Sequence, residues 1–332
     1  MQAILAVTVP FFALVLLGWL AARAHALPES AIPGLNAYVL FFALPCLLFR
    51  FGASLPFGRL ADPVLLAIYL TAALAIIALT IAVTVHRSGR SSGVDLRDAA
   101  FGALVAAFPN AGFMGVPLLV ALLGDDAAGP VIGAIVVDLV FTSTICLALA
   151  QSHHQRGRAD DARSAAAAAL RALRSALTNP LPWAIALGAV FAAAGRELPG
   201  PLAQIVRMLG DSATPVALFT IGTVLWRAGQ HAHTRTPAAR YLPVALIKLL
   251  VHPALVFALG LAARAAGAPL APFALMVLTL TAALPSASNV SLLAERFGAD
   301  NGRIARIVMA STVLAFATFT ATAWLFGVGR SR

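Results

Sequence analysis

Long apolar runs separated by short gaps dominate this chain of 332 residues. Each run approaches the roughly 20 residues that an α-helix needs to cross the hydrocarbon core of a bilayer. Only 11% of the residues are charged, whereas a soluble globular protein carries about 25%. So few charges could not cover a surface that faces water. The sequence therefore predicts an all-α integral membrane protein in contact with the lipid bilayer.

The charged and Gly/Pro-rich gaps divide the chain into ten predicted membrane-spanning helices. They lie near residues 1–22, 32–55, 63–85, 98–122, 129–151, 180–195, 201–226, 239–265, 270–294 and 303–327. The first run carries no charge at its start and is too long for a signal peptide, so we interpret it as a retained span.

The arginines predict the orientation of these spans. Fifteen lie in the odd-numbered gaps, and five lie outside those gaps and outside the spans: Arg59, Arg196, Arg264, Arg330 and Arg332. Cytoplasmic loops carry the excess of positive charge. We therefore expect a multi-pass protein of the cytoplasmic (inner) membrane with both termini outside. Such a distribution is not the basic face of a nucleic-acid-binding protein, in spite of the net charge of +10.

The longest gap, residues 152–179, is the predicted central cytoplasmic loop. Within it, Asp160–Leu177 combines an alanine run with leucines on one helical face and flanking arginines. This pattern suits an amphipathic helix on the anionic inner leaflet. A solvated linker helix fits it equally well.

The two halves of the chain share a pattern, P-x-x-L-F-x-x-G, at Pro45–Gly52 and again at Pro215–Gly222. A proline followed by polar residues also recurs, at Pro109 and at Pro285. Each half holds five spans, an odd number, so the second half must enter the membrane in the opposite sense. We therefore predict two inverted repeats, 1–151 and 180–332, an arrangement typical of secondary transporters.

Two of the spans are predicted to be broken helices. Proline removes a backbone donor and clashes with the preceding turn, and freed backbone groups in a membrane need protein or a wet cavity to satisfy them. The positive end of a half-helix attracts carboxylates. The predicted substrate-binding residues are Pro109, Asn110, Gly112, Gly115, Pro117, Pro285, Ser286, Ser288 and Asn289. Packed helices that are merely kinked are the simpler alternative.

Charged residues within spans are costly and usually functional. Asp138 and Lys248 fall inside the fifth and eighth spans, and Asp211 lies one helical turn from Arg207 in the seventh. Asp138 could take up a proton that drives transport, and Lys248 could supply positive charge or replace a sodium ion. A structural Asp138–Lys248 pair is the alternative, and Arg207 and Asp211 are expected to pair with each other. We expect His252, before Pro253, to be a packed residue at a helix bend.

The string Pro109-Asn110, then Met114-Gly115-Val116-Pro117-Leu118-Leu119, resembles a motif of the auxin efflux carrier (AEC) family, which includes the plant PIN carriers. The ninth span, from Leu284-Pro285 to Phe297, is similar to that family's second crossover. The resemblance implies a fold like that of bile-acid symporters, in which helices four and nine cross. It also implies a small organic anion as substrate, such as malate or malonate in bacterial members, and it maps the family's substrate-binding asparagine to Asn110.

The predicted function is thus a secondary transporter, or permease, for a small carboxylate. A channel or a sensor built on the same fold is the alternative. The sequence offers no nucleophile, acid–base pair or metal cluster, with Cys46 and Cys146 both inside apolar runs. We therefore predict no enzymatic activity and no cofactor, with coupling to H⁺ or Na⁺ open. Assembly as a homodimer is also left open.

Overall fold

The computed structural model describes residues 2–54, 62–88, 94–152, 178–230 and 236–328. Their regular secondary structure is helical, and one isolated β-bridge joins Pro109 and Ser286. The segment 160–177, predicted to form an amphipathic helix, lies outside the described residues.

The described residues of the first half of the chain form twelve helical elements. They are α1 (Gln2–Arg23), α2 (Ala31–Tyr38), η1 (Val39–Ala43), α3 (Leu44–Ser54), α5 (Pro63–Ser88), α6 (Leu96–Ala107), η2 (Ala111–Gly115), α7 (Val116–Leu123), η3 (Asp125–Ala127), α8 (Ala128–Val137), η4 (Asp138–Thr142) and α9 (Ser143–Ser152).

The described residues of the second half form eight helical elements. They are α11 (Pro180–Ala193), α12 (Gly200–Gln230), α13 (Ala238–Leu246), η6 (Ile247–Val251), α14 (His252–Ala265), α15 (Pro272–Ala282), α16 (Asn289–Arg296) and α17 (Asn301–Leu325). Among these elements η1, η2, η4 and η6 are single π-helical turns, and η3 is a 3₁₀ turn.

Seven helical segments within the described residues are long and apolar enough to cross a membrane. The segments Ala111–Leu123, Pro180–Ala193 and Pro272–Ala282 are apolar but shorter. These three fall in the predicted spans 98–122, 180–195 and 270–294. The expectation of a multi-pass helical membrane protein is confirmed.

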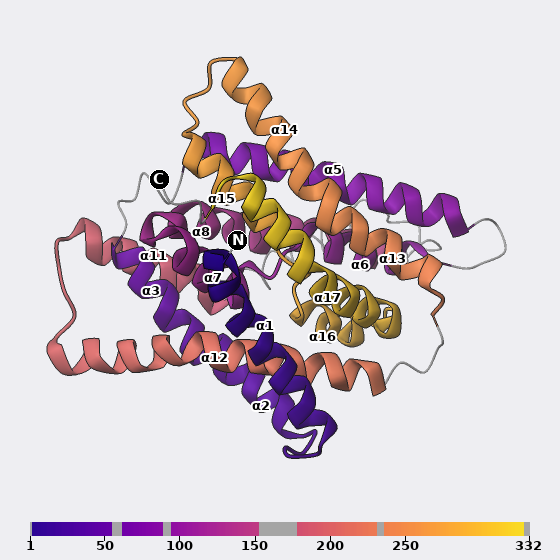
Figure 1. Ribbon diagram of the computed structural model, residues 1–332, viewed down its shortest axis with the longest axis horizontal. Coiled ribbons are helices and arrows are strands. Elements are labelled where there is room, and N and C mark those ends of the chain that lie inside the picture. Colours follow the sequence, from indigo (N-terminus) through magenta and orange to yellow (C-terminus); the bar gives the residue numbers. More distant parts are fainter. Residues whose placement is uncertain (1, 55–61, 89–93, 153–177, 231–235, 329–332) are drawn as a thin grey trace.

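One group of helices, which we call the frame bundle, consists of α1, α2 with η1, α3, α11 and α12. Within it α1 packs along α12, and α3 packs along α11 and α12. In Figure 1 the long helix α12 runs along the lower edge, with α1 and α2 crossing it. The frame bundle thus brings together the first two spans of each predicted repeat.

Glycines let the frame helices touch backbone to backbone. A Cβ on Gly18 of α1 would lie 2.0 Å from the carbonyl oxygen of Phe219, and one on Gly222 of α12 would lie 2.0 Å from that of Val15. The pair α3 and α11 repeats this arrangement, since Gly52 and Gly188 each face the backbone of the other helix. Small residues at such contacts are the usual means of close helix packing in membranes.

The remaining helices, α5 to α9 and α13 to α17, form what we call the crossing bundle. α5 packs against α6 and α14, α13 packs against α17, and α14 packs against α15. Figure 1 shows α5 and α14 side by side at the upper right. The two bundles meet where α12 and α1 contact α17, and where α12 contacts η2.

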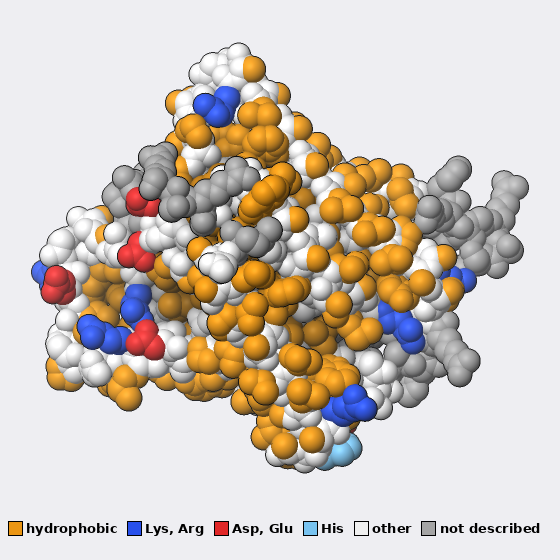
Figure 2. All heavy atoms as spheres, in the orientation of Figure 1, with side chains coloured by type: hydrophobic (Ala, Val, Ile, Leu, Met, Phe, Trp, Pro, Cys, Tyr) orange, Lys and Arg blue, Asp and Glu red, His pale blue; other side chains and the backbone are white. Residues whose placement is uncertain are grey.

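Hydrophobic side chains cover most of the face shown in Figure 2, and charged side chains gather towards its edges. This is the distribution that a lipid-facing surface requires. Within the described residues, the buried side chains that can carry charge on an acid or a basic nitrogen are Asp138, Lys248, His252 and Arg303. All four belong to the crossing bundle.

Candidate functional site

The first break follows from the proline at position 109. Proline disfavours helical backbone in the residue before it, and Phe108 leaves the helix with φ −100° and ψ 97°. Asn110 has φ −76° and ψ 54°, and the helix resumes at Ala111 as the π-helical turn η2. The predicted break at Pro109 is confirmed.

The second break is longer. α15 ends at Ala282 and α16 begins at Asn289, so residues 283–288 are not helical. Pro285, near the centre of this stretch, cannot donate a backbone hydrogen bond and cannot continue the helix. The predicted break at Pro285 is also confirmed.

The two breaks satisfy each other's backbone groups. The N–H of Asn110 donates to the carbonyl of Pro285 at 2.8 Å, and the N–H of Ala287 donates to the carbonyl of Phe108 at 3.0 Å. These bonds flank the antiparallel bridge between Pro109 and Ser286. The two broken segments therefore cross in direct backbone contact, which solves the problem of unpaired groups inside a membrane.

Side chains strengthen this crossing. The hydroxyl of Ser286 donates to the carbonyl of Val105 in α6 at 2.8 Å, and the backbone N–H of Ser286 donates to Ser311 Oγ at 3.2 Å. A Cβ on Gly115 would lie 2.6 Å from Leu284 Cδ1. Ser286 thus links the two segments by a hydrogen bond, and the lack of a side chain at Gly115 lets them pack closely.

A pocket opens beside the crossing, at the boundary between the two bundles. Its cavity volume is about 40 Å³, room for a few water molecules. The crossing bundle lines it with Phe108, Pro109, Asn110, Gly112, Phe113, Ile135, Asp138, Leu139, Ala287 and Asn289, and the frame bundle lines it with Leu40, Asn179 and Leu181. The frame residues come from η1 and from the start of α11.

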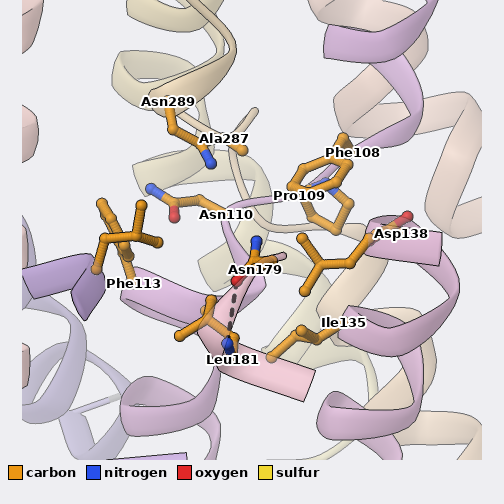
Figure 3. A pocket seen from close by; sticks show the side chains of 13 residues that line it. Phe108, Pro109, Asn110, Phe113, Ile135, Asp138, Asn179, Leu181, Ala287 and Asn289 are labelled. Atoms are coloured by element: carbon orange, nitrogen blue, oxygen red, sulfur yellow. Dashed lines mark hydrogen bonds between the residues drawn. The ribbon is translucent and has the colours of Figure 1, made fainter. Parts of the chain in front are cut away.

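Three carboxamides from distant parts of the chain converge in this pocket (Figure 3). Asn110 is only 5% exposed, and its side chain makes no capping hydrogen bond to η2. Asn289 Oδ1 is buried and has no hydrogen-bond partner among the described residues. Asn179 Oδ1 caps α11 by accepting from the N–H of Leu181 at 3.0 Å. The capping bond leaves the NH₂ group of Asn179 to face the pocket.

Asp138 contributes to the wall of the pocket, but its carboxyl group points away from the three asparagines (Figure 3). Tyr69 Oη donates to Asp138 Oδ2 at 3.0 Å, and Thr142 Oγ1 donates to Asp138 Oδ1 at 3.0 Å. Asp138 is 1% exposed and Tyr69 is fully buried. The carboxyl group is therefore held between the pocket and a buried hydroxyl of α5.

Lys248 lies in the same polar region but bonds elsewhere. Its Nζ donates to the carbonyl oxygen of Ala282 at 2.7 Å and lies 3.1 Å from His252 Nδ1. The ring of His252 lies 5.7 Å from that of Tyr69, centroid to centroid. Lys248 thus places its amino group at the carbonyl end of α15, just before the second break, where the helix dipole favours a positive charge.

A direct Asp138–Lys248 ion pair was one expectation. Both residues are described, and no salt bridge joins them: each finds the partners given above. The two charges are instead linked through Tyr69 and His252. His252 itself is buried at the start of α14, before Pro253, as expected of a packed residue at a helix junction.

The expected pairing of Arg207 with Asp211 is wrong. Asp211 Oδ1 accepts from Arg50 Nη1 at 2.6 Å, a bond between α12 and α3. The side chain of Asp211 is 61% exposed and that of Arg50 is 40% exposed. Spacing of four along one helix suggested the local partner, but the neighbouring helix brings Arg50 closer. Asp211 does not line the pocket.

The predicted substrate-binding residues divide into three groups. Those that line the pocket are Pro109, Asn110, Gly112 and Asn289. Those that join the two breaks are Gly115, Pro285 and Ser286.

Pro117 and Ser288 belong to neither of the first two groups. Pro117 lies in the first turn of α7, and Ser288 precedes α16 with its carbonyl accepting from Ser291 Oγ at 2.8 Å. Within the described part of the chain, no group of three or more His, Cys, Asp or Glu residues could hold a metal ion.

Asn179 lies at the end of the predicted central loop and is not among the predicted site residues. An asparagine directly before Pro180 is a typical start of a helix, so the capping role could have been predicted. Its place beside the crossing could not, because it depends on how α11 packs against α3.

A family profile described as "Membrane transport protein" matches residues 3–325 of the chain. The "Putative malonate transporter" of Rhizobium meliloti (strain 1021) is 27% identical over 332 residues, which cover 99% of this chain and 98% of that protein. The match thus extends over almost the entire length of both proteins.

Two further relatives are more distant. The "Uncharacterized transporter YfdV" of Escherichia coli (strain K12) is 26% identical, over 96% of this chain and 95% of its own length. "Auxin efflux carrier component 8" of Arabidopsis thaliana is 24% identical, over 77% of this chain and 80% of its own. The names of all three describe transporters rather than enzymes.

Proposed function

The chain belongs to the membrane transport protein family, the auxin efflux carrier family that its motifs resemble, and from this premise we propose the function of its pocket. The protein is a secondary transporter that carries a small carboxylate across the cytoplasmic membrane. The observation that supports this most strongly is the pairing of two broken helices beside a pocket with three converging carboxamides.

The carboxylate is bound by neutral donors in this proposal. The NH₂ groups of Asn110, Asn179 and Asn289 supply hydrogen bonds, and the half-helices that begin at η2 and α16 direct the positive ends of their dipoles towards the same region. The apolar walls exclude water and make each of these bonds stronger. Asn110 is the residue on which binding depends most, because its side chain is buried and free of a structural role.

The architecture that we propose is ten spans in two inverted repeats, 1–151 and 180–332, with both termini outside. The frame glycines support it. Gly18 and Gly188 are 170 residues apart, and so are Gly52 and Gly222. The α1–α12 contact uses one member of each pair, and the α3–α11 contact uses the other two. Two equivalent contacts are what a two-fold relation between the halves requires.

Transport in this scheme is a movement of the crossing bundle against the frame bundle. The pocket lies at their boundary, with walls from both, so a sliding or rocking motion changes the side to which it opens. The tight glycine contacts keep the frame rigid, while the crossing carries the substrate. Alternating access of this kind is the usual mode of carriers with inverted repeats.

Coupling is assigned to a proton that binds at Asp138. The carboxyl group is the ionisable side chain nearest the substrate in the pocket wall, and the hydroxyls of Tyr69 and Thr142 can hold it in either protonation state. Lys248 keeps a fixed positive charge on the carbonyl of Ala282, where a bound cation would otherwise be needed. This arrangement favours H⁺ over Na⁺ as the coupling ion.

Purified protein in proteoliposomes provides the test. We expect saturable counterflow of a radiolabelled carboxylate, accelerated by an inward proton gradient and lost in Asn110→Ala. Asn36→Ala, in α2 of the frame and outside the pocket, is the matched control and should transport normally. Flux that does not saturate, or that ignores the gradient, would point to a channel instead.

A further inference from the structure

The ionisable groups of the pocket set a limit on the charge of its ligand. Among the described residues that line the pocket, Asp138 is the one that can ionise. The other polar contributors are the three carboxamides and the backbone. Eight lining side chains are apolar: Leu40, Phe108, Pro109, Phe113, Ile135, Leu139, Leu181 and Ala287. The described lining thus offers hydrogen bonds to an anion, but no positively charged side chain.

The nearby basic groups are committed elsewhere. Lys248 is fully buried outside the lining, with Nζ on the carbonyl of Ala282 and on His252. The Arg303 guanidinium donates to the carbonyls of Asp98 and Arg240 and to Thr84 Oγ1. Neither residue lines the cavity beside Asn110.

Three NH₂ groups match the needs of one carboxylate, whose two oxygens can accept about four hydrogen bonds. A second carboxylate on the same small molecule would face the apolar wall or the carboxyl group of Asp138. Moving a charge into such surroundings without a counter-charge is strongly unfavourable. A neighbouring carboxylate of the same sign adds repulsion.

We infer that the pocket accepts its ligand with a single negative charge, so that a dicarboxylic acid binds and crosses as its singly protonated form. This inference rests on the proposed function, since it assumes that the pocket is the substrate site. It deepens that function by excluding dianions, whatever the carbon skeleton of the acid.

Titration of the protein must be separated from titration of the ligand. The titratable or charged groups around Asp138 are Tyr69 from α5, Cys146 from α9, Lys248 from η6 and His252 from α14. Any of these could make binding depend on pH. Comparing the diacid with a ligand whose charge is fixed at −1 over the same pH range removes the contribution of these protein groups, because it affects both ligands.

The test compares malonate and succinate with their monomethyl esters, and includes propionate. Binding is measured as the ligand-induced rise in Tm of the full-length protein in detergent, between pH 5 and pH 8. Because each pH unit above the second pKa of a diacid lowers its monoanion about tenfold, the apparent Kd of the diacid relative to its half-ester should rise about tenfold per unit.

The variant Asp138→Asn removes the titration of Asp138, so that any remaining pH dependence of the ratio comes from protonation of the ligand. It removes the acid from the pocket wall but keeps an acceptor for Tyr69, and the slope of the ratio against pH should persist in it. Diacids that bind equally well at all pH values, or a slope that vanishes in Asp138→Asn, would overturn the monoanion inference. Half-esters or propionate that bind while dianions do not would support it.

The same panel separates this inference from the proposed function. If Asn110→Ala abolishes binding of dianions that the wild type accepts at pH 8, the site is correct and only the charge limit fails. If no carboxylate raises Tm or undergoes counterflow in any charge state, the carboxylate transporter itself is contradicted, and the charge limit fails with it.

Discussion

The frame bundle and the crossing bundle are built in opposite ways from similarly apolar sequence. The frame joins its helices through backbone contacts at Gly18, Gly52, Gly188 and Gly222. The crossing bundle contains the two helix breaks, three of the four π-helical turns and the four buried side chains with charged or basic groups. In the frame bundle, glycines without side chains let the helices pack closely. The crossing bundle instead keeps buried polar groups, which cost stability.

This contrast teaches where function resides. Buried polar groups and broken helices in a membrane persist only where surrounding protein satisfies them. At the crossing the broken segments satisfy one another's backbone groups, as between Asn110 and Pro285, and the unpaired Oδ1 of Asn289 belongs to a residue that lines the pocket. The five predictions below test this division, since substitutions in the frame should change stability and substitutions at the crossing should change transport.

The largest effect is expected in the frame. In Gly222→Leu, the new Cβ would lie 2.0 Å from the carbonyl oxygen of Val15, so α1 and α12 must separate. We expect a loss of more than about 3 kcal/mol of stability, measured as a collapse of the monodisperse peak in detergent and a fall in Tm. Gly34→Ala, in helix α2 with nothing within 4 Å of its new Cβ, is the control and should not lower Tm.

Asn110→Ala is expected to lower uptake about ten- to hundredfold, because a hydrogen bond to a charged ligand contributes about 1.5–3 kcal/mol. Tm without ligand should stay close to that of the wild type, since the side chain has no capping role. Uptake and Tm are measured on the same preparation. A variant that loses stability and transport together would mean that Asn110 belongs to the architecture instead.

Asp138→Asn is expected to remove the pH dependence of uptake. If Asp138 carries the coupling proton, wild-type uptake rises as the external pH falls, because the protonated form becomes more populated. With a substrate whose charge is fixed at −1, such as a monomethyl ester or propionate, the Asn variant keeps the shape of the side chain and cannot bind that proton, so its rate should be flat with pH and unresponsive to a proton gradient. Full, pH-dependent uptake of such a substrate by the variant would exclude the proton role.

Two substitutions of Asn179 separate its capping role from ligand binding. Both Asp and Ser cap helices well, so α11 should keep its start in either variant. Asn179→Asp also places a carboxylate against the anionic ligand and should lower its affinity about tenfold or more, whereas Asn179→Ser only removes one donor and should lower it a few-fold. Affinity is measured by ligand-induced change in Tm. Equal losses in both variants would speak against a ligand contact.

The smallest effect is expected for Asp211→Asn. Its ion pair with Arg50 is short but largely exposed, and exposed pairs contribute about 0–1 kcal/mol. Uptake and its pH dependence should match the wild type, because Asp211 lies outside the pocket. A loss of proton coupling in this variant would restore Asp211 as a coupling residue and weaken the role given to Asp138.

Part of this organisation was predictable from the sequence. Proline at positions 109 and 285 breaks a helix for local reasons, so both breaks could be located without a structure. Gly52 and Gly222 were singled out as parts of a repeated motif. In the structure these two glycines contact the backbones of α11 and α1, so the repeated motif marks two close helix contacts.

Other parts could not be predicted, because they depend on packing between distant segments. Arg50 of α3 pairs with Asp211 of the neighbouring helix α12. Lys248 bonds the backbone carbonyl of Ala282, a partner that no residue type in the sequence indicates. The four π-helical turns leave no clear pattern in an apolar run. Asn179 was predictable as a cap but not as part of a pocket, since only the packing of α11 brings it beside Asn110.

Counterflow in proteoliposomes tests the central claim most directly. Vesicles loaded with unlabelled malonate, succinate or propionate are diluted into a trace of the same labelled compound, with wild-type protein, Asn110→Ala and Asn36→Ala in parallel. The account predicts transient accumulation of at least one label with wild type and Asn36→Ala, and accumulation about tenfold slower or more with Asn110→Ala. Equal accumulation with all three proteins, or none with any of them, would contradict it.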